Sequence, residues 1–219
     1  VGHSATATGA TMNPLFMPTI LRVLFAALPL LVAACGQAGD VQPEAAPRTS
    51  ASAITQPERG TPLPRIVFLG DSLTAGLGLP KEQAVPALIQ RRLDAEGYAY
   101  EAVNAGVSGD TAAGGLSRLE WSLQGDVAML IVELGANDGL RGLPVSQLKH
   151  NLSEIISRAQ QRGVTVILTG MEAPPNFGDA YTSEFRRVFR DLADEYDVAF
   201  VPFFLEGVAG IPSLNNADG

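Results

Sequence analysis

The sequence is short of the residues that hold metal ions and disulfide bonds. It has one cysteine and two histidines among 219 residues, so an intrachain disulfide is excluded and a Cys/His zinc cluster cannot be assembled. Basic residues are also few: 15 Lys and Arg stand against 23 Asp and Glu, which gives a net charge of -8. Nucleic-acid binding rests on neutralising phosphates with Lys and Arg, so we expect no nucleic-acid partner. We also expect no metal or other cofactor, and a fold stabilised by its apolar core.

Long apolar runs are missing as well. The run at residues 23–35 is shorter than the roughly 20 apolar residues that span a bilayer, contains Pro29 and ends in small residues. With Arg22 just before it, this pattern predicts a secretory signal sequence rather than a membrane span. Its end, Leu31-Val-Ala-Ala-Cys35, resembles the lipobox of bacterial lipoproteins, which implies cleavage before Cys35 and a lipid on that cysteine. The alternatives are an ordinary signal peptide and a buried helix with a chance cysteine.

The organisation of the chain follows from this segment. Residues 1–35 are predicted to be an upstream extension plus a lipoprotein-type signal peptide, in which Met12 and Met17 are sensible starts. Residues 36–64 are rich in Ala, Pro, Gln, Thr and Ser and have little to bury, which predicts a flexible tether. The globular domain occupies residues 65–219. We expect an exported protein of a Gram-negative bacterium, periplasmic or anchored in the outer membrane, that contacts membranes only through its lipid.

Strand-like and helix-like runs alternate through the globular part. The predicted strands lie at 65–70, 99–104, 127–134, 164–170 and 198–203. The third and fourth are almost continuously apolar, as strands covered on both faces must be. Apolar residues recur at helical spacing between the strands, for example at Val145, Leu148 and Leu152. This alternation predicts an α/β fold, a three-layer αβα flavodoxin-like sandwich with a five-stranded parallel sheet.

Three polar motifs each follow a predicted strand. They are Gly70-Asp71-Ser72-Leu73, Ser108-Gly109-Asp110 and Gly135-Ala136-Asn137-Asp138. Each has a structural explanation by itself: Ser72 or Asp71 can cap a helix, Gly109 can adopt a positive φ, and Asn137 can lie in a turn. In parallel α/β sheets, however, ligands bind beyond the carboxyl ends of the strands. Three motifs in loops at that edge therefore indicate a hydrolase active site.

The motifs resemble those of the SGNH, or GDSL, hydrolases, and the resemblance covers about residues 65–219. The longer strings at 104–111 and 132–142 are similar to the bacterial subgroup of multifunctional acyl-CoA thioesterases, lysophospholipases and arylesterases. The resemblance implies a serine esterase or thioesterase that acts on acyl esters or thioesters of small molecules. It does not indicate the acyl chain length, the leaving group or the oligomeric state.

The resemblance also assigns roles to residues. Ser72 would be the nucleophile, because a serine hydroxyl attacks once a base removes its proton. The backbone N–H groups of Ser72 and Gly109 and the side-chain amide of Asn137 would form the oxyanion hole, which stabilises the charge that develops on the carbonyl oxygen. Asp218 matches the aspartate of the family's Asp-Gly-x-His-Pro block, and that aspartate orients the catalytic histidine.

The catalytic histidine of that block is the one part of the pattern without a match. It would lie two residues beyond Gly219, and the family's last helix would follow it, so we expect a C-terminally truncated domain. His150 lies off the apolar face of its predicted helix and is interpreted as a solvated residue. His3 precedes the signal segment.

Other functions were weighed against the serine hydrolase. A carbohydrate O-deacetylase of the same fold is the alternative within the enzyme class. A non-catalytic flavodoxin-like binding module would hold a flavin phosphate at residues 71–76, but no aromatic residue clearly flanks that loop. A phosphoacceptor receiver domain would use Asp71 and Asp138, but it needs a lysine after the last strand and none follows there. The segment Glu172–Gly178 is predicted, by position alone, to shape the acyl pocket.

Overall fold

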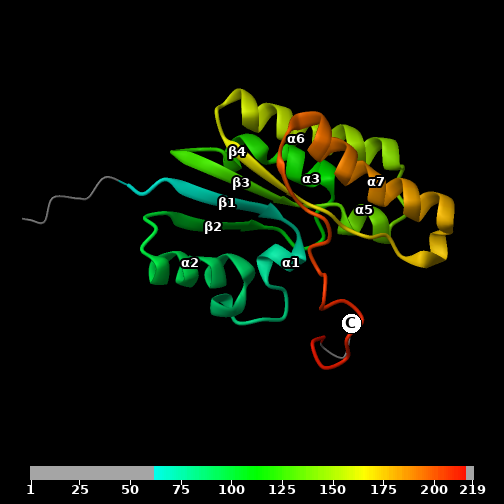
Figure 1. The fold of residues 1–219 in the computed structure, drawn as a ribbon, viewed down its shortest axis with the longest axis horizontal. Coiled ribbons are helices and arrows are strands. Elements are labelled where there is room, and N and C mark those ends of the chain that lie inside the picture. Colours follow the sequence, from blue (N-terminus) through cyan, green and yellow to red (C-terminus); the bar gives the residue numbers. More distant parts are fainter. Residues whose placement is uncertain (1–61, 216–219) are drawn as a thin grey trace, which may run out of the picture. The chain divides into compact units, whose positions relative to one another are not determined.

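The computed structural model describes residues 62–215, which form one parallel sheet with helices on both faces (Figure 1). The strands are β1 Arg65–Gly70, β2 Glu101–Gly106, β3 Val127–Glu133, β4 Thr165–Thr169 and β5 Ala199–Val201. They are ordered β2-β1-β3-β4-β5, and each neighbouring pair is parallel. The predicted α/β fold with five parallel strands is therefore confirmed. The signal segment with Cys35, the tether up to residue 61 and Asp218 lie outside the described residues.

Four of the five strands differ from their predicted bounds: β3 and β4 by one residue at one or both ends, and β2 and β5 by up to two. β2 begins at Glu101, because Gly97 ends the preceding helix and the Tyr98 N–H donates back to the Leu93 carbonyl at 2.9 Å. Residues 98–100 connect the end of this helix to the sheet, so the strand begins after them. β5 ends at Val201 because Pro202 has no N–H to donate to a neighbouring strand.

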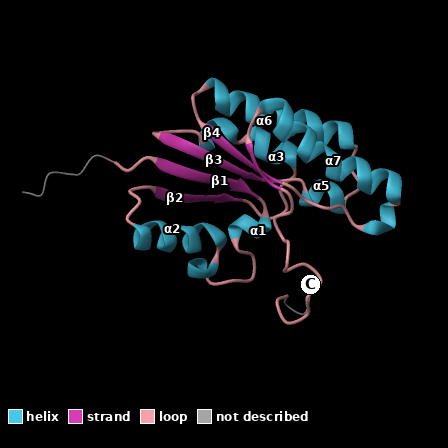
Figure 2. Cartoon of the chain, in the orientation of Figure 1, coloured by secondary structure: helices cyan, strands magenta, loops and turns pink. Residues whose placement is uncertain are grey.

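The helices form a layer on each side of the sheet (Figures 1 and 2). Their bounds are α1 Ser72–Ala75, α2 Val85–Glu96, α3 Ala112–Ser117, α4 Leu119–Ser122, α5 Ala136–Leu140, α6 Val145–Gln161 and α7 Asp179–Tyr196, with short 3-10 turns η1 Lys81–Gln83 and η2 Pro175–Phe177. α3, α6 and α7 cover one face, and α1 and α2 lie on the other (Figure 1). Every helix within the described range is too short or too polar to cross a bilayer.

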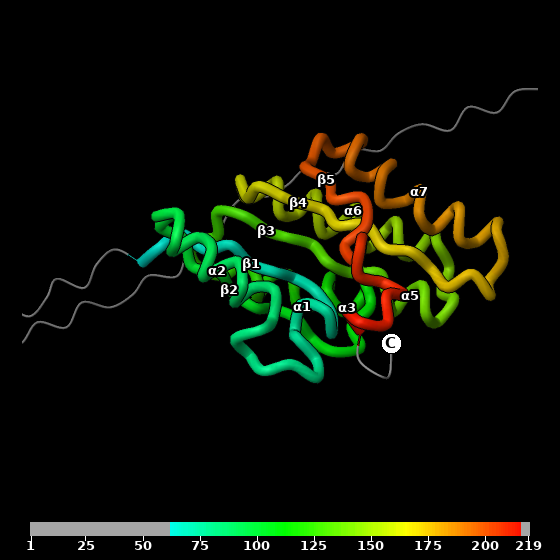
Figure 3. Tube along the Cα trace, turned by 60° about the horizontal axis from the view of Figure 1, so that its bottom comes forward, coloured from blue at the N-terminus to red at the C-terminus, as the bar shows by residue number. Residues whose placement is uncertain are grey.

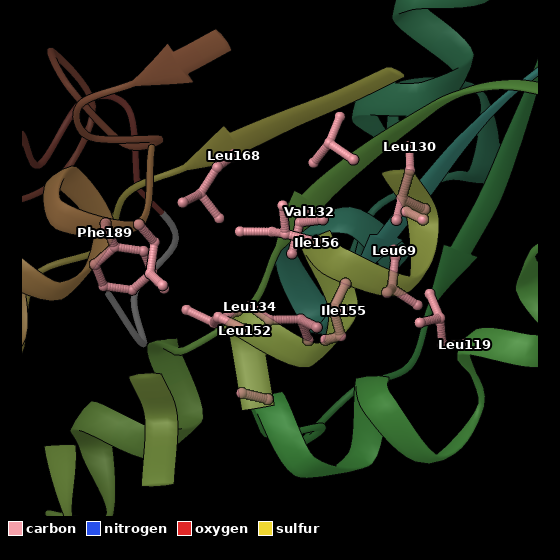
Figure 4. Close-up of a cluster of buried hydrophobic side chains, with 14 of the residues drawn as sticks. Leu69, Leu119, Leu130, Val132, Leu134, Leu152, Ile155, Ile156, Leu168 and Phe189 are labelled. Atoms are coloured by element: carbon pink, nitrogen blue, oxygen red, sulfur yellow. The ribbon is translucent and has the colours of Figure 1, made fainter. Parts of the chain in front are cut away.

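The apolar core lies between the sheet and the α6–α7 layer (Figure 4). There Leu130 and Val132 of β3 and Leu168 of β4 are fully buried against Ile156 of α6 and Phe189 of α7. The alternate strand residues, which face the other way, are only partly buried: Met129, Ile131 and Ile167. The sheet is thus held rigidly from one side, and its carboxyl edge is where β1 continues into α1 and β3 into α5 (Figure 3).

Candidate active site

The first motif forms a tight turn from strand to helix. β1 ends at Gly70, Asp71 caps α1, and Ser72 is the first residue of that helix. The Asp71 carboxylate accepts the Leu73 N–H at 3.0 Å and is fully buried, whereas Ser72 is partly exposed. Ser72 lies in a helical first turn rather than in the expected loop, because the Asp71 side chain accepts the Leu73 N–H, one of the donors that a helix start leaves unpaired. The turn places the serine at the carboxyl edge of the sheet.

The other two motifs lie at the same edge. Gly109 is in the loop between β2 and α3 with φ of +85°, a conformation that favours glycine, and its carbonyl accepts a hydrogen bond from Arg141 at 2.8 Å. Asn137 lies not in the expected loop but at the second position of α5, which begins three residues after the end of β3. Both short helices thus start within three residues of a strand end, so their first turns stay at the sheet edge.

Asn137 links the three motifs. Its side-chain nitrogen donates to the Asp71 carboxylate at 3.0 Å and to the Asp110 carbonyl at 2.9 Å. One acceptor directly precedes Ser72 in the chain and the other directly follows Gly109. The N–H groups of Ser72 and Gly109 donate to no group within residues 62–215. The structure therefore brings Ser72, Gly109 and Asn137 into one cluster, in which two backbone donors are free to face a ligand. Their catalytic roles stay predictions.

An arginine that the motifs did not single out fixes this cluster to the sheet. Arg118, between α3 and α4, donates to the Asp110 carboxylate at 2.6 Å and to the carbonyls of Ala105 and Gly70 at 2.5 and 2.8 Å. One guanidinium therefore joins the ends of β1 and β2 to the loop that carries Gly109. Its planar fork of donors suits such a junction. Arg118 follows no recognisable motif, so no sequence pattern marks it as part of the site.

Three buried carboxyl groups lie under the site. Asp71, Glu133 and Asp138 are 0%, 1% and 2% exposed. Burial raises the pKa of each; it raises that of Glu133 to about 8, and the nearby charge of Asp71 acts in the same direction. Asp138 accepts the Ala112 N–H at 2.9 Å and so ties α5 to α3. Three buried carboxyl groups whose pKa values are raised by burial therefore underlie the cluster of Ser72, Gly109 and Asn137.

The remaining predicted residues lie elsewhere. His150 is on the exposed side of α6 and makes no hydrogen bond to Ser72. The segment 172–178 follows β4 and contains η2, where Phe177 packs against Tyr181 with ring centres 5.3 Å apart. A cavity of about 460 Å³ adjoins it between α7 and the loop after β5. Of the segment predicted to shape an acyl pocket, only Glu172 lines that cavity.

The chain is similar to known lipases and acylhydrolases. A model of the GDSL-like lipase/acylhydrolase family matches residues 68–218. Esterase TesA of Pseudomonas aeruginosa is 46% identical over 155 residues, which cover 70% of this chain and 77% of TesA. The protein named thioesterase 1/protease 1/lysophospholipase L1 of Escherichia coli K12 is 36% identical over 155 residues, 70% of this chain and 73% of that protein.

A solved structure shows the same fold. AlinE4, described as an SGNH-hydrolase family esterase, aligns with a TM-score of 0.68 and 44% identity. The alignment covers 72% of this chain and 85% of AlinE4. The range matched by the family model, residues 68–218, includes all three motifs.

Proposed function

Because this chain belongs to the GDSL-like lipase/acylhydrolase family and is an ester hydrolase, we propose that Ser72 is its nucleophile. The predicted family and enzyme class are confirmed, and the non-catalytic binding module is set aside. In the proposed reaction the Ser72 hydroxyl oxygen attacks the acyl carbonyl carbon while a base takes its proton. The alcohol or thiol leaves with a proton, and water then hydrolyses the acyl-enzyme by the same steps.

The oxyanion would be held by the Ser72 and Gly109 N–H groups and the Asn137 amide. The observation that carries this proposal is the pair of Asn137 hydrogen bonds, which hold the amide between the residue before Ser72 and the residue after Gly109. A carbonyl oxygen bound to the two backbone donors would draw one amide hydrogen away from the Asp110 carbonyl. Removing one such donor typically lowers kcat by about 10²–10³.

The base is proposed to be a histidine oriented by Asp218. The described residues bring no histidine to Ser72, since His150 lies on the outer side of α6. Activity is therefore measured on the full-length protein expressed from its complete gene, with hydrolysis of a p-nitrophenyl short-chain ester as the assay. Ser72→Ala should abolish turnover, with a loss on the order of 10⁶ in kcat as for a triad serine. Retention of a tenth of the activity would overturn the proposal.

The substrates are proposed to be acyl esters and thioesters, including arylesters and lysophospholipids. The names of the similar proteins, an esterase and a thioesterase/lysophospholipase, support this range. No feature of the described site favours the carbohydrate O-deacetylase. A panel of one acyl chain on phenol, thiol and glycerophosphate leaving groups would rank the classes by kcat/KM.

The protein is further proposed to be exported and lipid-anchored through Cys35, with residues 36–64 as its tether. The support is the position of the only cysteine at the end of a signal-like segment. Expressed in a Gram-negative host, the protein should fractionate with membranes and incorporate labelled palmitate, and Cys35→Ser should block the labelling. A soluble, unlabelled wild-type protein would contradict the anchor and leave the hydrolase proposal intact.

A further inference from the structure

A buried glutamate lies directly under the turn that carries Ser72. Glu133 is the last residue of β3 and is 1% exposed. One of its carboxyl oxygens, Oε2, accepts the Asp71 N–H at 3.3 Å, the Thr74 N–H at 3.2 Å and the Thr74 hydroxyl at 2.7 Å. Its other oxygen has no hydrogen-bond partner among residues 62–215. Carboxyl groups are almost never buried this deeply without a specific set of partners.

The partners of Glu133 flank the nucleophile on both sides. Asp71 precedes Ser72 and Thr74 follows it by two residues, so one oxygen atom holds the turn at both ends. Asp71 in turn accepts the hydrogen bond of the Asn137 amide. We propose that Glu133 is a positioning residue of the hydrolase, which fixes the Ser72 turn through Asp71 and Thr74 and so sets the position of the hydroxyl and N–H of Ser72. This inference rests on the proposed role of Ser72.

Thr74 and Glu133 pack closely against the backbone of Gly70, the last residue of β1 before the turn. A Cβ atom added at Gly70 would lie 2.0 Å from the Thr74 hydroxyl oxygen and 2.6 Å from Oε2 of Glu133. If the carboxyl were removed, the N–H groups of Asp71 and Thr74 would be buried without an acceptor, and the turn would have to shift to reach another one. A displacement of about 1 Å in an active site can lower the rate about 100-fold.

The charges around Glu133 fit a neutral carboxyl. Asp71 faces it from the cap of α1, and Asp138 of α5 adds further negative charge near Asp71. Arg118 reaches the Gly70 carbonyl on the far side of the turn, but its guanidinium is paired with Asp110. Burial, and after it the charge of Asp71, raises the pKa of Glu133 to about 8, so the group carries its proton at neutral pH. Ionisation above that pH would place a second negative charge beneath the forming oxyanion.

The test compares kinetics of Glu133 variants in the full-length protein. Glu133→Ala should lower kcat about 100-fold with KM changed less than about threefold, since substrate contacts remain and only the nucleophile is misplaced. Glu133→Gln should keep kcat within about fivefold at pH 7, because an amide oxygen accepts the same hydrogen bonds. The matched control is Thr169→Val, which removes the buried hydroxyl of β4 that donates to the Val132 carbonyl at 3.1 Å. It should lower stability and leave kcat per folded molecule unchanged.

The pH profile gives a second readout that packing alone would not change. Wild-type kcat should decline as pH rises through about 8, and Glu133→Gln should remove that decline. If Glu133→Ala does not fold, two variants of Thr74 test the inference instead. Thr74→Val, which loses the hydroxyl, should lower kcat about 10-fold, and Thr74→Ser, which keeps a hydroxyl, should have a kcat near that of wild type. A folded Glu133→Ala variant with the kcat of wild type would overturn the inference. If Glu133→Ala is unfolded, equal kcat values for Thr74→Val and Thr74→Ser would overturn it. Activity that survives Ser72→Ala would instead overturn the proposed function.

Discussion

The stability of the fold should fall as the pH rises from 5 to 8, and Glu133 should account for much of the change. Its pKa rises from an ordinary value of 4.5 to about 8 in the folded protein, because burial and the charge of Asp71 disfavour the ionised form. Between these two values the folded state holds a proton that the unfolded state has released. The contribution of Glu133 to the free energy of unfolding is therefore fully present below pH 4.5 and is lost as the pH rises through 8.

The size of the effect follows from the two pKa values. One pKa unit corresponds to about 1.4 kcal/mol, so this group should remove about 3 kcal/mol of unfolding free energy between pH 5 and pH 8. That is a large part of the 5–15 kcal/mol typical of a folded domain. Asp71, whose pKa is also raised by burial, should contribute with the same sign.

Urea unfolding followed by circular dichroism at pH 5, 6, 7 and 8 would measure this loss. The decisive quantity is the difference between Glu133→Gln and wild type, since titrating groups that do not interact with Glu133 contribute equally to both. Stability of Glu133→Gln relative to wild type should increase by about 3 kcal/mol over this range. Glu154→Gln, which removes an exposed pair with Arg158, is the control and should show almost no such trend. Parallel pH curves for wild type and Glu133→Gln would refute the reasoning.

Two further predictions concern the candidate site. Asn137→Ala should lower kcat about 10²–10³-fold with little change in KM, because the amide acts on the transition-state oxygen; a lower melting temperature with unchanged kcat per folded molecule would show that it serves only the fold. His150→Ala should leave kcat and KM within about twofold of wild type, since the side chain is exposed on α6. A large loss of kcat in that variant would identify His150 as the base and contradict the role given to Asp218.

The sequence predicted the sheet and the three motifs because both depend on local patterns. The apolar run at Val127–Val132 is long enough to define β3, and the motifs directly follow strand ends whatever the order of the strands. The partners that fix the motifs were not predictable in this way. Arg118 reaches the Gly70 carbonyl across 48 residues and the Ala105 carbonyl across 13. Backbone carbonyls are present at every position, so no sequence pattern marks these two as its acceptors.

Glu133 is different, because its position does carry a signal. It is the last residue of an apolar strand that has a neighbouring strand on each side. At this position a carboxyl group stands where the pattern of the strand predicts an apolar side chain. A carboxyl at such a position must be neutral or paired, since burying an isolated charge is prohibitive. Its partners, Asp71 and Thr74, are about 60 residues away in sequence but lie beside it because β1 and β3 are adjacent. The pairing of β1 with β3 is what places this buried acid beside the turn that carries Ser72.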